Sequence, residues 1–494
     1  MINVEPGSVA GYAWPQSVRP GESFALHLSS AVSQVNIEIA RIGLHREVCL
    51  RATATAGYHG YPVRFTAEGC DWPEATRIEV GAWPSGFYEI VLSAKGAAPS
   101  RAFVVVRPAR GAEKAMLLEL TTNTWNAYND VHNALNLYTG SHACSFQRPM
   151  APGFLYKPSG LGRRVASDVT PDPLRVVHTG YKSVHGLSDW CGSAGWPNWE
   201  QVFVAWAERQ GYELDYAINA DLEDPDLLTP YRLMLSVGHD EYWSAPMRDT
   251  VESFISSGGN VAFLSGNTAF WQVRVEDGGR TMVGYKYGFE SDPVHGTGRQ
   301  REITSLWSDA LTGRPENTMT GLSFTRGGYS RIGTRVPSGS GAYTIHRKEH
   351  WLLNGTGLEY GDLLGGASTI VGYECDGCEL EYRDGLPYAT GRDGTPTDLE
   401  IVATAPASPF DRASVTRPIP DDQPSELEFA AWRVLGSMDI AAQDRLRHGH
   451  SVLGTYTGGG TVVNSGSTDW VLGLTGKDPQ VEQVTHNILR RLGK

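Results

Sequence analysis

The sequence predicts an α/β protein in which a doubly wound sheet, with helices on both faces, follows a small all-β domain. Two observations predict the sheet. Short apolar runs, such as residues 233–237 and 260–264, have the length of buried strands, and they alternate with segments of helical periodicity such as residues 199–206. Polar and aromatic residues directly follow these runs. Because ligands bind at the carboxyl edge of an open parallel sheet, we expect the functional site at these strand ends.

The chain is long enough for two domains, because 494 residues exceed one ordinary hydrophobic core. We predict a β-sandwich of immunoglobulin type over residues 1–110. Five short β-rich runs, separated by Gly and Pro turn signals, support it: residues 24–28, 35–40, 77–80, 88–92 and 102–106. Residues 108–113 have the composition of a linker, and the predicted α/β domain spans residues 114–494.

The elements of the α/β domain are predicted from apolar runs and helix caps. Strands are expected at residues 115–120, 213–218, 233–237, 260–264 and 461–464. Asn198, Ser244 and Asp478 stand where helix N-caps are needed, and each precedes apolar residues at helical spacing. Residues 277–443 lose this periodicity and alternate Gly-rich segments with strand-like pieces. We expect them to form a β-rich insertion that walls the ligand pocket.

Charge and composition narrow the class of partner. The 42 basic and 55 acidic residues give a formal net charge of −13, which argues against nucleic acid or an anionic membrane and favours a small-molecule substrate. No apolar run approaches the roughly 20 residues of a membrane span, and residues 1–10 lack the pattern of a secretory leader, so we expect a cytoplasmic protein. No phosphate-binding glycine loop is present, so no nucleotide is expected. Association into a homo-oligomer is left open.

The cysteines and histidines give weak metal signals. Cys375 and Cys378 form a single CxxC pair, whereas zinc ribbons need two, so we expect all six cysteines to be free thiols. His346 and His350 have i, i+4 spacing, but their segment is more typical of a strand or loop than of a helix. A metal site at either pair is therefore not expected.

The strongest candidate site follows the strand at residues 233–237. His239, Asp240, Glu241 and Tyr242 place an imidazole, two carboxylates and a phenol at one strand end, where they are candidate catalytic groups. The alternative is a hydrogen-bonded turn in which Tyr242 packs as a core aromatic. Candidate substrate-binding residues come from segments after two neighbouring strands: Asn123, Trp125, Tyr128, Asn267 and Arg274. Asn123 follows the strand at residues 115–120, and Trp125 and Tyr128 lie in the next segment, residues 124–130, which is predicted to be a loop.

Six spaced motifs resemble one known family. They are NTWNAYN at residues 123–129, SFQRP at 145–149, GHDEYWS at 238–244, SGNTAFWQVR at 265–274, VGYE at 371–374 and GGTVVNSGSTDWVLGL at 459–474. In this order they are similar to the C-terminal domain of the N,N-dimethylformamidase large (beta) subunit, over most of residues 115–494. The resemblance implies a glutamine amidotransferase-like sheet, and amide hydrolysis at a mononuclear iron held by two tyrosines and a glutamate.

The same resemblance implies metal-binding roles for Tyr242, in the HDEY position, and for Glu302. The helix expected at residues 199–206 contains no tyrosine for the second phenol ligand. Phenolate and carboxylate are hard oxygen ligands that suit Fe(III). Coordination would ionise a phenol, whose ordinary pKa is about 10.

Three hypotheses follow. The first is a hydrolase of a small amide C–N bond, with Fe(III) as its cofactor. The second is a metal-free enzyme on the same scaffold, which uses residues 239–242 for acid–base catalysis. The third is a protein that binds a saccharide or peptide without turnover. Metal content separates the first two, and mutation of residues 239–242 separates both from the third.

Overall fold

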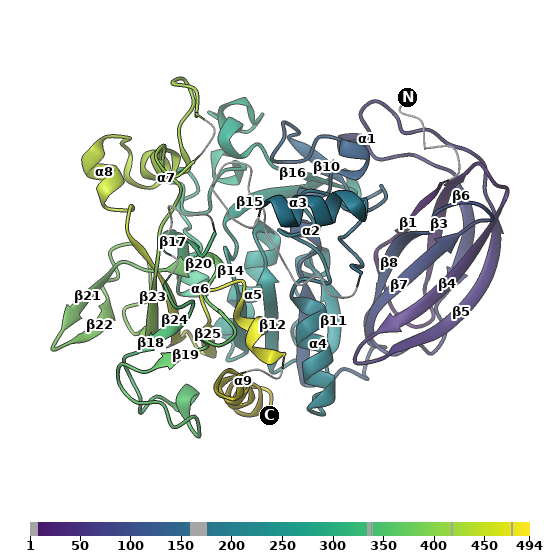
Figure 1. Ribbon diagram of the computed structural model, residues 1–494. Coiled ribbons are helices and arrows are strands. Elements are labelled where there is room, and N and C mark those ends of the chain that lie inside the picture. Colours follow the sequence, from purple (N-terminus) through teal and green to yellow (C-terminus); the bar gives the residue numbers. More distant parts are fainter. Residues whose placement is uncertain (1–7, 159–174, 333–336, 338, 416–417, 476–477) are drawn as a thin grey trace.

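The computed structural model describes residues 8–158, 175–332, 337, 339–415, 418–475 and 478–494. It has two regions side by side, an all-β region at the N-terminus and a larger region built around a long mixed sheet (Figure 1). The chain is thus mixed α/β, as predicted. Residues 1–7, which enter the prediction that no leader is present, lie outside the described residues. Within the described part, no helix combines the length and apolar character needed to cross a membrane.

The N-terminal region consists of two sheets that enclose one apolar core. One sheet contains β1 (Val9–Trp14), β3 (Ser23–Ser30) and β6 (Glu74–Glu79), and the other contains β2 (Ser17–Val18), β8 (Ser100–Val106), β7 (Gly86–Ser93), β4 (Gln34–Ile42) and β5 (Arg46–Thr55). Side chains from both sheets, such as Leu26 on β3 and Ile37 on β4, are buried in the shared core. The predicted β-rich runs lie in these strands. Assignment of this sandwich to the immunoglobulin type remains a prediction.

The larger region of the described chain is organised around a nine-stranded mixed sheet. Five neighbouring strands are parallel: β11 (Asp215–Ile218), β9 (Met116–Leu120), β12 (Leu233–His239), β14 (Asn260–Gly266) and β25 (Thr461–Asn464). Antiparallel strands continue the sheet: β24 (Gly449–Thr457), β23 (Glu400–Ala407), β18 (Tyr343–Ile345) and β19 (Leu363–Leu364). The predicted strands correspond to the parallel half. That residues 277–443 line a ligand pocket remains a prediction. Three strands of this segment, β18, β19 and β23, also extend the sheet.

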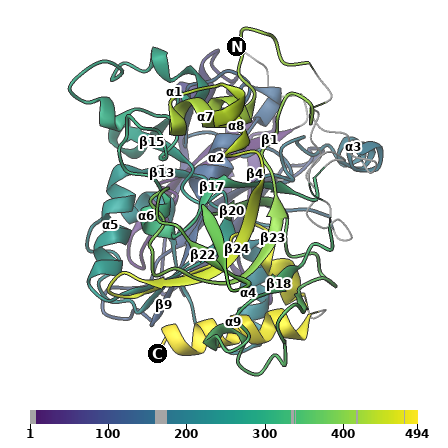
Figure 2. The ribbon, with the colours of Figure 1, turned by 90° about the vertical axis from the view of Figure 1, so that its left-hand side faces the viewer.

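Helices cover both faces of the parallel half, as a doubly wound sheet requires. Side chains alternate along β12. Leu235 faces the core that contains α4 (Glu200–Arg209) and α9 (Pro479–Leu492), and Met234 faces the core that contains α5 (Ala245–Ser256). In Figure 2, α9 lies at the end of the molecule opposite to α7 (Glu426–Leu435) and α8 (Ile440–Asp444). A closer relation to glutamine amidotransferase folds remains a prediction.

Two of the three expected helix caps are found where the sequence places them. Ser244 is the N-cap of α5, and the side chain of Asp478 accepts a hydrogen bond from the backbone N–H of Val481 at the start of α9. Helix α4 instead begins after Trp199, one residue later than the cap expected at Asn198. A shift of one residue at a helix end is small, because helix termini are the least sharply defined part of a helix.

Smaller elements complete the larger region. Short strands form further sheets: β10 (Ala143–Ser145), β16 (Thr281–Val283), β15 (Trp271–Glu276) and β13 (Tyr242–Ser244) in one, β17 (Ser323–Ser330) and β20 (Tyr373–Gly377) in another, and β21 (Leu380–Arg383) with β22 (Leu386–Ala389). The remaining α-helices are α1 (Phe65–Glu68), α2 (Thr122–Tyr128), α3 (Arg175–Val184) and α6 (Asn317–Thr320). The prediction of a loop at residues 124–130 is wrong. Residues 124–128 of this segment belong to α2, whose side chains are all buried, because tertiary packing stabilises a helix too short to form alone.

The two regions pack against each other through aromatic side chains. Phe87 on β7 stacks on Trp196 with ring centroids 4.2 Å apart, and Phe103 on β8 meets Trp125 edge-on at 5.5 Å. These rings are buried in an apolar core that also contains residues of the nine-stranded sheet. The two regions, which residues 108–113 connect in the chain, therefore share one apolar core. A domain boundary between residues 110 and 114 remains a prediction.

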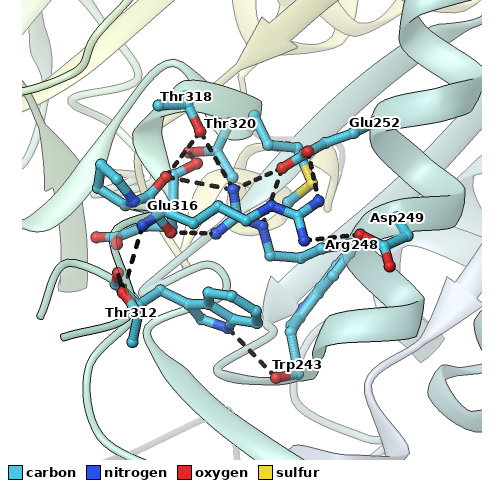
Figure 3. A network of polar contacts seen from close by, with 12 residues as sticks. Trp243, Arg248, Asp249, Glu252, Thr312, Glu316, Thr318 and Thr320 are labelled. Atoms are coloured by element: carbon cyan, nitrogen blue, oxygen red, sulfur yellow. Dashed lines mark hydrogen bonds and ion pairs between the residues drawn. The ribbon is translucent and has the colours of Figure 1, made fainter. Parts of the chain in front are cut away.

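A network of polar side chains fixes α5 to a segment that follows it in the chain (Figure 3). Arg248 on α5 is buried, and it donates to Glu252 Oε1 at 2.6 Å and to the carbonyl oxygen of Arg314 at 2.6 Å. Its guanidinium lies over the ring of Trp307, 4.4 Å from the centroid. Glu252 Oε2 also accepts from Arg314 Nη2 at 2.5 Å. The network holds residues 307–318 against α5 and so against one face of the sheet.

Candidate active site

The carboxyl end of β12 is shaped by a glycine. Gly238 has φ +87°, and a Cβ at this position would lie 2.5 Å from the Cβ of Trp199. Both the left-handed backbone and this close approach require glycine. Just beyond it, Asn123 Nδ2 on α2 donates to the carbonyl oxygen of Tyr242 at 3.1 Å. Helix α2 therefore holds the loop that carries the candidate catalytic residues, and Asn123 serves as a positioning residue.

Three buried side chains converge at this strand end. His239 Nε2 lies 2.7 Å from Glu374 Oε2 and 3.2 Å from Glu241 Oε2. On the other side of the ring, His239 Nδ1 lies 2.7 Å from the carbonyl oxygen of Ser193, which can accept a hydrogen bond from Nδ1–H. The three side chains are at most 3% exposed, and among the described residues the Nε2 and both Oε2 atoms lack well-aligned hydrogen bonds. Buried polar atoms in this state indicate a place where a ligand, water or ion binds.

The protonation states of these groups depend on one another. Burial lowers the pKa of His239, but Glu374 and Glu241 raise it, so that it lies well above the ordinary value. Burial raises the pKa of Glu241, but hydrogen bonding and the charges of His239 and Lys286 bring it below the ordinary value. For Glu374 burial dominates, and its pKa is raised. An imidazolium is thus held between a carboxylate that stays ionised, Glu241, and a carboxyl group that takes up a proton more readily, Glu374.

Two tyrosines form a hydrogen-bonded chain that ends at the carboxylate of Glu241. Tyr138 Oη donates to Glu241 Oε1 at 2.5 Å, and Tyr128 Oη donates to Tyr138 Oη at 2.8 Å. Trp271 Nε1 also donates to Glu241 Oε1, at 2.8 Å. Burial and the neighbouring Glu241 raise the pKa of both phenols well above the usual range. The phenols therefore stay protonated near neutral pH unless a strong cation binds beside them.

A buried lysine lies beside the tyrosines. Lys286 is 2% exposed, and its Nζ donates to Tyr242 Oη at 2.8 Å and lies 3.1 Å from the ring centroid of Tyr138. Its backbone has φ +56°, in the left-handed region that lysine rarely adopts, so the local fold bears strain to direct this side chain inward. Burial lowers the pKa of Lys286 to about 7. The ammonium can therefore lose its proton near neutral pH.

Asp240, a predicted catalytic residue, points away from this cluster. Its Oδ2 accepts from Ser236 Oγ at 2.7 Å, and its Oδ1 accepts from Asn219 Nδ2 at 3.3 Å. Successive side chains of an extended segment point to opposite faces, so Asp240 cannot join His239 and Glu241 on theirs. Its contacts are structural, and the geometry does not support a direct catalytic role.

Two of the predicted substrate-binding residues belong to the scaffold. Arg274 Nη1 donates to Asp292 Oδ2 at 2.8 Å in an ion pair. Trp125 Nε1 donates to Glu200 Oε1 at 3.1 Å, and its ring packs in the core between the two regions. Asn267 differs from both. Its φ is +52°, and its buried Oδ1 has no hydrogen-bond partner among the described residues, so its amide remains a candidate to bind a ligand.

The two predicted metal ligands do not meet in the structure. Tyr242 is fully buried, and its hydroxyl accepts from Lys286. The side chain of Glu302 is 44% exposed, and its carboxylate pairs with Arg299 at 2.5 Å. The two partners lie three residues apart, at a short 3₁₀ turn over Gln300–Glu302 that places them on one side. The geometry therefore does not support a metal ion shared by Tyr242 and Glu302.

Sequence reasoning missed Tyr138, Lys286 and Glu374. Glu374 ends the VGYE motif at residues 371–374, so the family resemblance did carry a signal for it. Tyr138 lies in a segment without periodicity, and Lys286 is an isolated lysine in an irregular segment. Lysines are mostly exposed, and nothing in the local sequence marks this one as buried.

The other metal signals in the sequence are absent from the described structure. His346 Nε2 lies 2.8 Å from Thr404 Oγ1 and His350 Nε2 lies 3.1 Å from Thr455 Oγ1. All six cysteines are free thiols, as predicted. Across the described residues, no group of three His, Cys, Asp or Glu side chains is placed to hold a metal ion.

Comparisons with known proteins agree with the motif resemblance. The family described as "N,N-dimethylformamidase beta subunit-like, C-terminal" matches residues 37–484, so the match begins within β4 of the sandwich and not near residue 115. The N,N-dimethylformamidase beta subunits of Alcaligenes sp. and Paracoccus aminophilus are 25% and 23% identical to this chain over 316 residues. Each alignment covers 59% of this chain and 36% of the relative, so the chain matches little more than a third of the length of these curated relatives.

One solved structure, a Paenibacillus sp. cycloisomaltooligosaccharide glucanotransferase, aligns with 24% of this chain and 16% of its own. The sequence identity is 14% and the TM-score is 0.16, which is too low to indicate a shared fold.

Proposed function

Because this chain belongs to the N,N-dimethylformamidase beta subunit-like family, we propose that it hydrolyses the C–N bond of a small amide at the carboxyl end of β12. The observation that carries the proposal is a convergence of buried acid, base and phenol groups there: His239, Glu241, Glu374, Tyr128 and Tyr138. The similar proteins are named N,N-dimethylformamidase, so N,N-dimethylformamide is the first substrate to test.

Fe(III) is the proposed cofactor, with a donor set that differs from Tyr242 and Glu302. The resemblance implies two tyrosines and a glutamate, and Tyr128, Tyr138 and Glu241 supply these groups in a hydrogen-bonded chain that runs from Tyr128 through Tyr138 to Glu241. Their hard oxygen atoms suit a ferric ion. The Oε2 of Glu241, which is buried and lacks a well-aligned hydrogen bond among the described residues, supports the fit. A cation would also offset the burial that keeps the two phenols protonated.

When bound, such an ion would act as a Lewis acid toward the amide carbonyl. The protein's own groups move the protons. Glu374 Oε2 can accept a proton from the attacking water, and His239 Nε2, 2.7 Å away, can give a proton to the leaving amine nitrogen. The contact of His239 Nδ1 with the Ser193 carbonyl fixes the orientation of the ring. In sum, one amide and one water give one carboxylic acid and one amine.

Metal content and colour test the cofactor. Freshly purified protein should contain stoichiometric iron and show a visible phenolate-to-iron charge-transfer band. Tyr128→Phe and Tyr138→Phe should each lose the band and most of the iron while circular dichroism shows a folded chain, since each change removes a single hydroxyl. Iron and colour retained in both variants would rule out this donor set.

Amine release from a panel of small amides tests the activity. The panel includes formamide, N-methylformamide, N,N-dimethylformamide and acetamide. Glu241→Gln and Glu374→Gln should abolish turnover, because the first removes a proposed iron ligand and the second removes the proposed base. Glu302→Gln is the control, and it should keep turnover because Glu302 pairs with Arg299 near the surface. Absence of amine release from every amide with iron-loaded protein would refute the proposal.

A metal-free enzyme on the same scaffold is the second candidate, and Lys286 favours it. The Lys286 ammonium lies 3.1 Å from the ring centroid of Tyr138, where its positive charge opposes the binding of another cation. With a pKa of about 7, Lys286 can also exchange a proton at Nζ with bound groups near neutral pH. If this candidate is correct, removal of iron by a chelator leaves turnover unchanged, and Lys286→Met abolishes it.

A further inference from the structure

We propose that a carboxylate among aromatic rings beside the catalytic cluster binds the amine product as an alkylammonium cation. The group consists of four side chains, which we call the amine subsite: Glu426, Tyr287, Tyr329 and Phe429. The inference rests on the proposed amide hydrolysis, because that reaction releases an amine that is protonated near neutral pH. The subsite would make amides of alkylamines the preferred substrate class.

Glu426 supplies the negative charge of the amine subsite. It is the first residue of α7, where the helix dipole favours an anion, and it is half-buried. Its Oε2 accepts from Tyr329 Oη at 2.8 Å, and its Oε1 accepts from the backbone N–H of Phe410 at 3.3 Å. Among the described residues, no lysine, arginine or histidine forms an ion pair with it, so its charge is available to a ligand.

The amine subsite adjoins the catalytic cluster through two contacts. Tyr329 stands directly opposite Glu374 in the antiparallel ladder between β17 and β20. Tyr287 meets Trp271 edge-on with ring centroids 5.3 Å apart, and Trp271 donates to Glu241. The amine subsite therefore borders the catalytic cluster through Glu374 and Trp271.

Aromatic faces complete the amine subsite on its outer side. Tyr287 is 45% exposed, whereas its neighbour Trp271 is 1% exposed. Exposure to solvent therefore increases from Trp271 to Tyr287. The ring of Tyr287 meets that of Phe429 at 4.7 Å. A carboxylate beside aromatic faces attracts an alkylammonium through ion pairing and cation–π contact. A neutral alkyl group of the same shape gains neither attraction.

The charged groups that face Glu426 determine the pH at which the amine subsite is best tested. Burial raises the pKa of Glu426 to about 8, and Glu374 and Glu241 contribute to the rise. At pH 9, which is above this pKa, Glu426 is ionised, and an added cation meets its carboxylate.

Choline and its neutral isostere 3,3-dimethyl-1-butanol are the probes, because they share a shape and differ in charge. Calorimetry of the full chain at pH 9, with no amide present, measures both. We expect choline to bind at least about tenfold more tightly than the alcohol. Glu426→Gln should weaken choline binding about tenfold, while the amide oxygen of glutamine can still accept from Tyr329.

Glu428→Gln is the matched control. Glu428 lies on the same first turn of α7, but its carboxylate pairs with Arg412 at 2.9 Å, so the variant removes an equal charge outside the amine subsite. It should bind choline as the wild type does. Equal binding of the two probes, or equal choline binding by wild type and Glu426→Gln, would overturn the inference. Choline binding without turnover of any amide would support the subsite and reject the hydrolase, and turnover without choline binding would do the reverse.

Discussion

Arg248 and Lys286 are both buried cations, and the protein surrounds them in opposite ways. Arg248 donates to Glu252 and to backbone carbonyls of the segment that α5 holds, including that of Arg314 (Figure 3). Lys286 donates to Tyr242, and its other close neighbours are the faces of aromatic rings. Among the described residues, no carboxylate oxygen lies within ion-pair distance of its Nζ.

The difference separates a structural charge from a functional one. A guanidinium whose donors are all engaged stabilises one conformation and stays charged. An ammonium with few partners lowers stability, and its pKa moves toward neutrality, where it can act on a substrate. Sequence alone cannot make this distinction, because both residues are basic side chains in segments of mixed character. The predictions below test it, in order of decreasing expected effect.

Arg248→Met should lower the free energy of unfolding by about 3 kcal/mol, because it leaves the half-buried carboxylate of Glu252 and two backbone carbonyls without the donor that Arg248 supplies. Urea denaturation measures the change. Arg314→Met is the control: Arg314 also pairs with Glu252 but is 30% exposed, and its loss should cost about 1 kcal/mol or less. Equal losses in the two variants would break the comparison.

Lys286→Met should lower kcat/KM for the amide that is turned over by about 100-fold, or about 2.7 kcal/mol of transition-state stabilisation. The free energy of unfolding should change by no more than about 1 kcal/mol, because methionine fills the space and the cost of a buried ammonium disappears. Lys182→Met, which removes a buried lysine paired with Asp189 at 3.0 Å, is the control and should keep turnover. A Lys286→Met variant that unfolds as readily as Arg248→Met would contradict the functional assignment.

The parallel half of the sheet could be predicted because its signals are local. Short, mostly apolar runs at residues 233–237 and 260–264, and the short run at residues 461–464, are strands, and Ser244 and Asp478 mark the helices that begin at residues 245 and 479. Strands β18 and β19 are too short for a periodic pattern, and β23 lies in the Gly-rich insertion. Their place in the sheet depends on pairing with distant partners, which no local window contains.

The candidate site could be predicted only where it follows a strand end. His239 and Glu241 follow β12, and Tyr128 follows β9, so the order of elements brings them to one edge. Tyr138 reaches Glu241 across 103 positions of sequence, and Glu374 comes from the insertion. Those contacts depend on loop paths. The catalytic role of Asp240 remains a prediction, and the alternation of an extended segment separates its side chain from those of its two neighbours.

Glu200 is a buried charged group with some hydrogen-bond partners, intermediate between Arg248 and Lys286. The pH dependence of stability measures what its burial costs. Its Oε1 accepts from Thr121 Oγ1 at 2.8 Å and from Trp125 Nε1 at 3.1 Å, but among the described residues its buried Oε2 has no partner. Burial raises the pKa of Glu200 to about 8. A carboxyl group whose pKa is raised by folding adds stability below its unfolded pKa, and this stability is lost as pH rises through the folded pKa.

Glu200→Gln resembles the protonated side chain at every pH. Its free energy of unfolding should match that of the wild type near pH 5 and exceed it by about 2 kcal/mol at pH 9, where the wild type must bury a carboxylate. Urea denaturation at both pH values measures the difference. Glu213→Gln, at a side chain that is 76% exposed, should show no such change with pH. A pH-independent difference between Glu200→Gln and wild type would contradict the assignment.

Tyr242→Phe carries the smallest expected effect and the sharpest test of the comparison, because it removes the hydroxyl to which Lys286 donates. The free energy of unfolding should fall by about 1 kcal/mol. The pKa of Lys286 should drop below about 7, since the charged form loses a hydrogen bond, and any alkaline limb of kcat/KM that Lys286 controls should move to lower pH. Iron and colour should remain, because Tyr128, Tyr138 and Glu241 are intact. Loss of iron and colour in this variant would show that Tyr242 is a metal ligand. The contrast between Arg248, a cation with many partners, and Lys286, a cation with few, would then no longer hold.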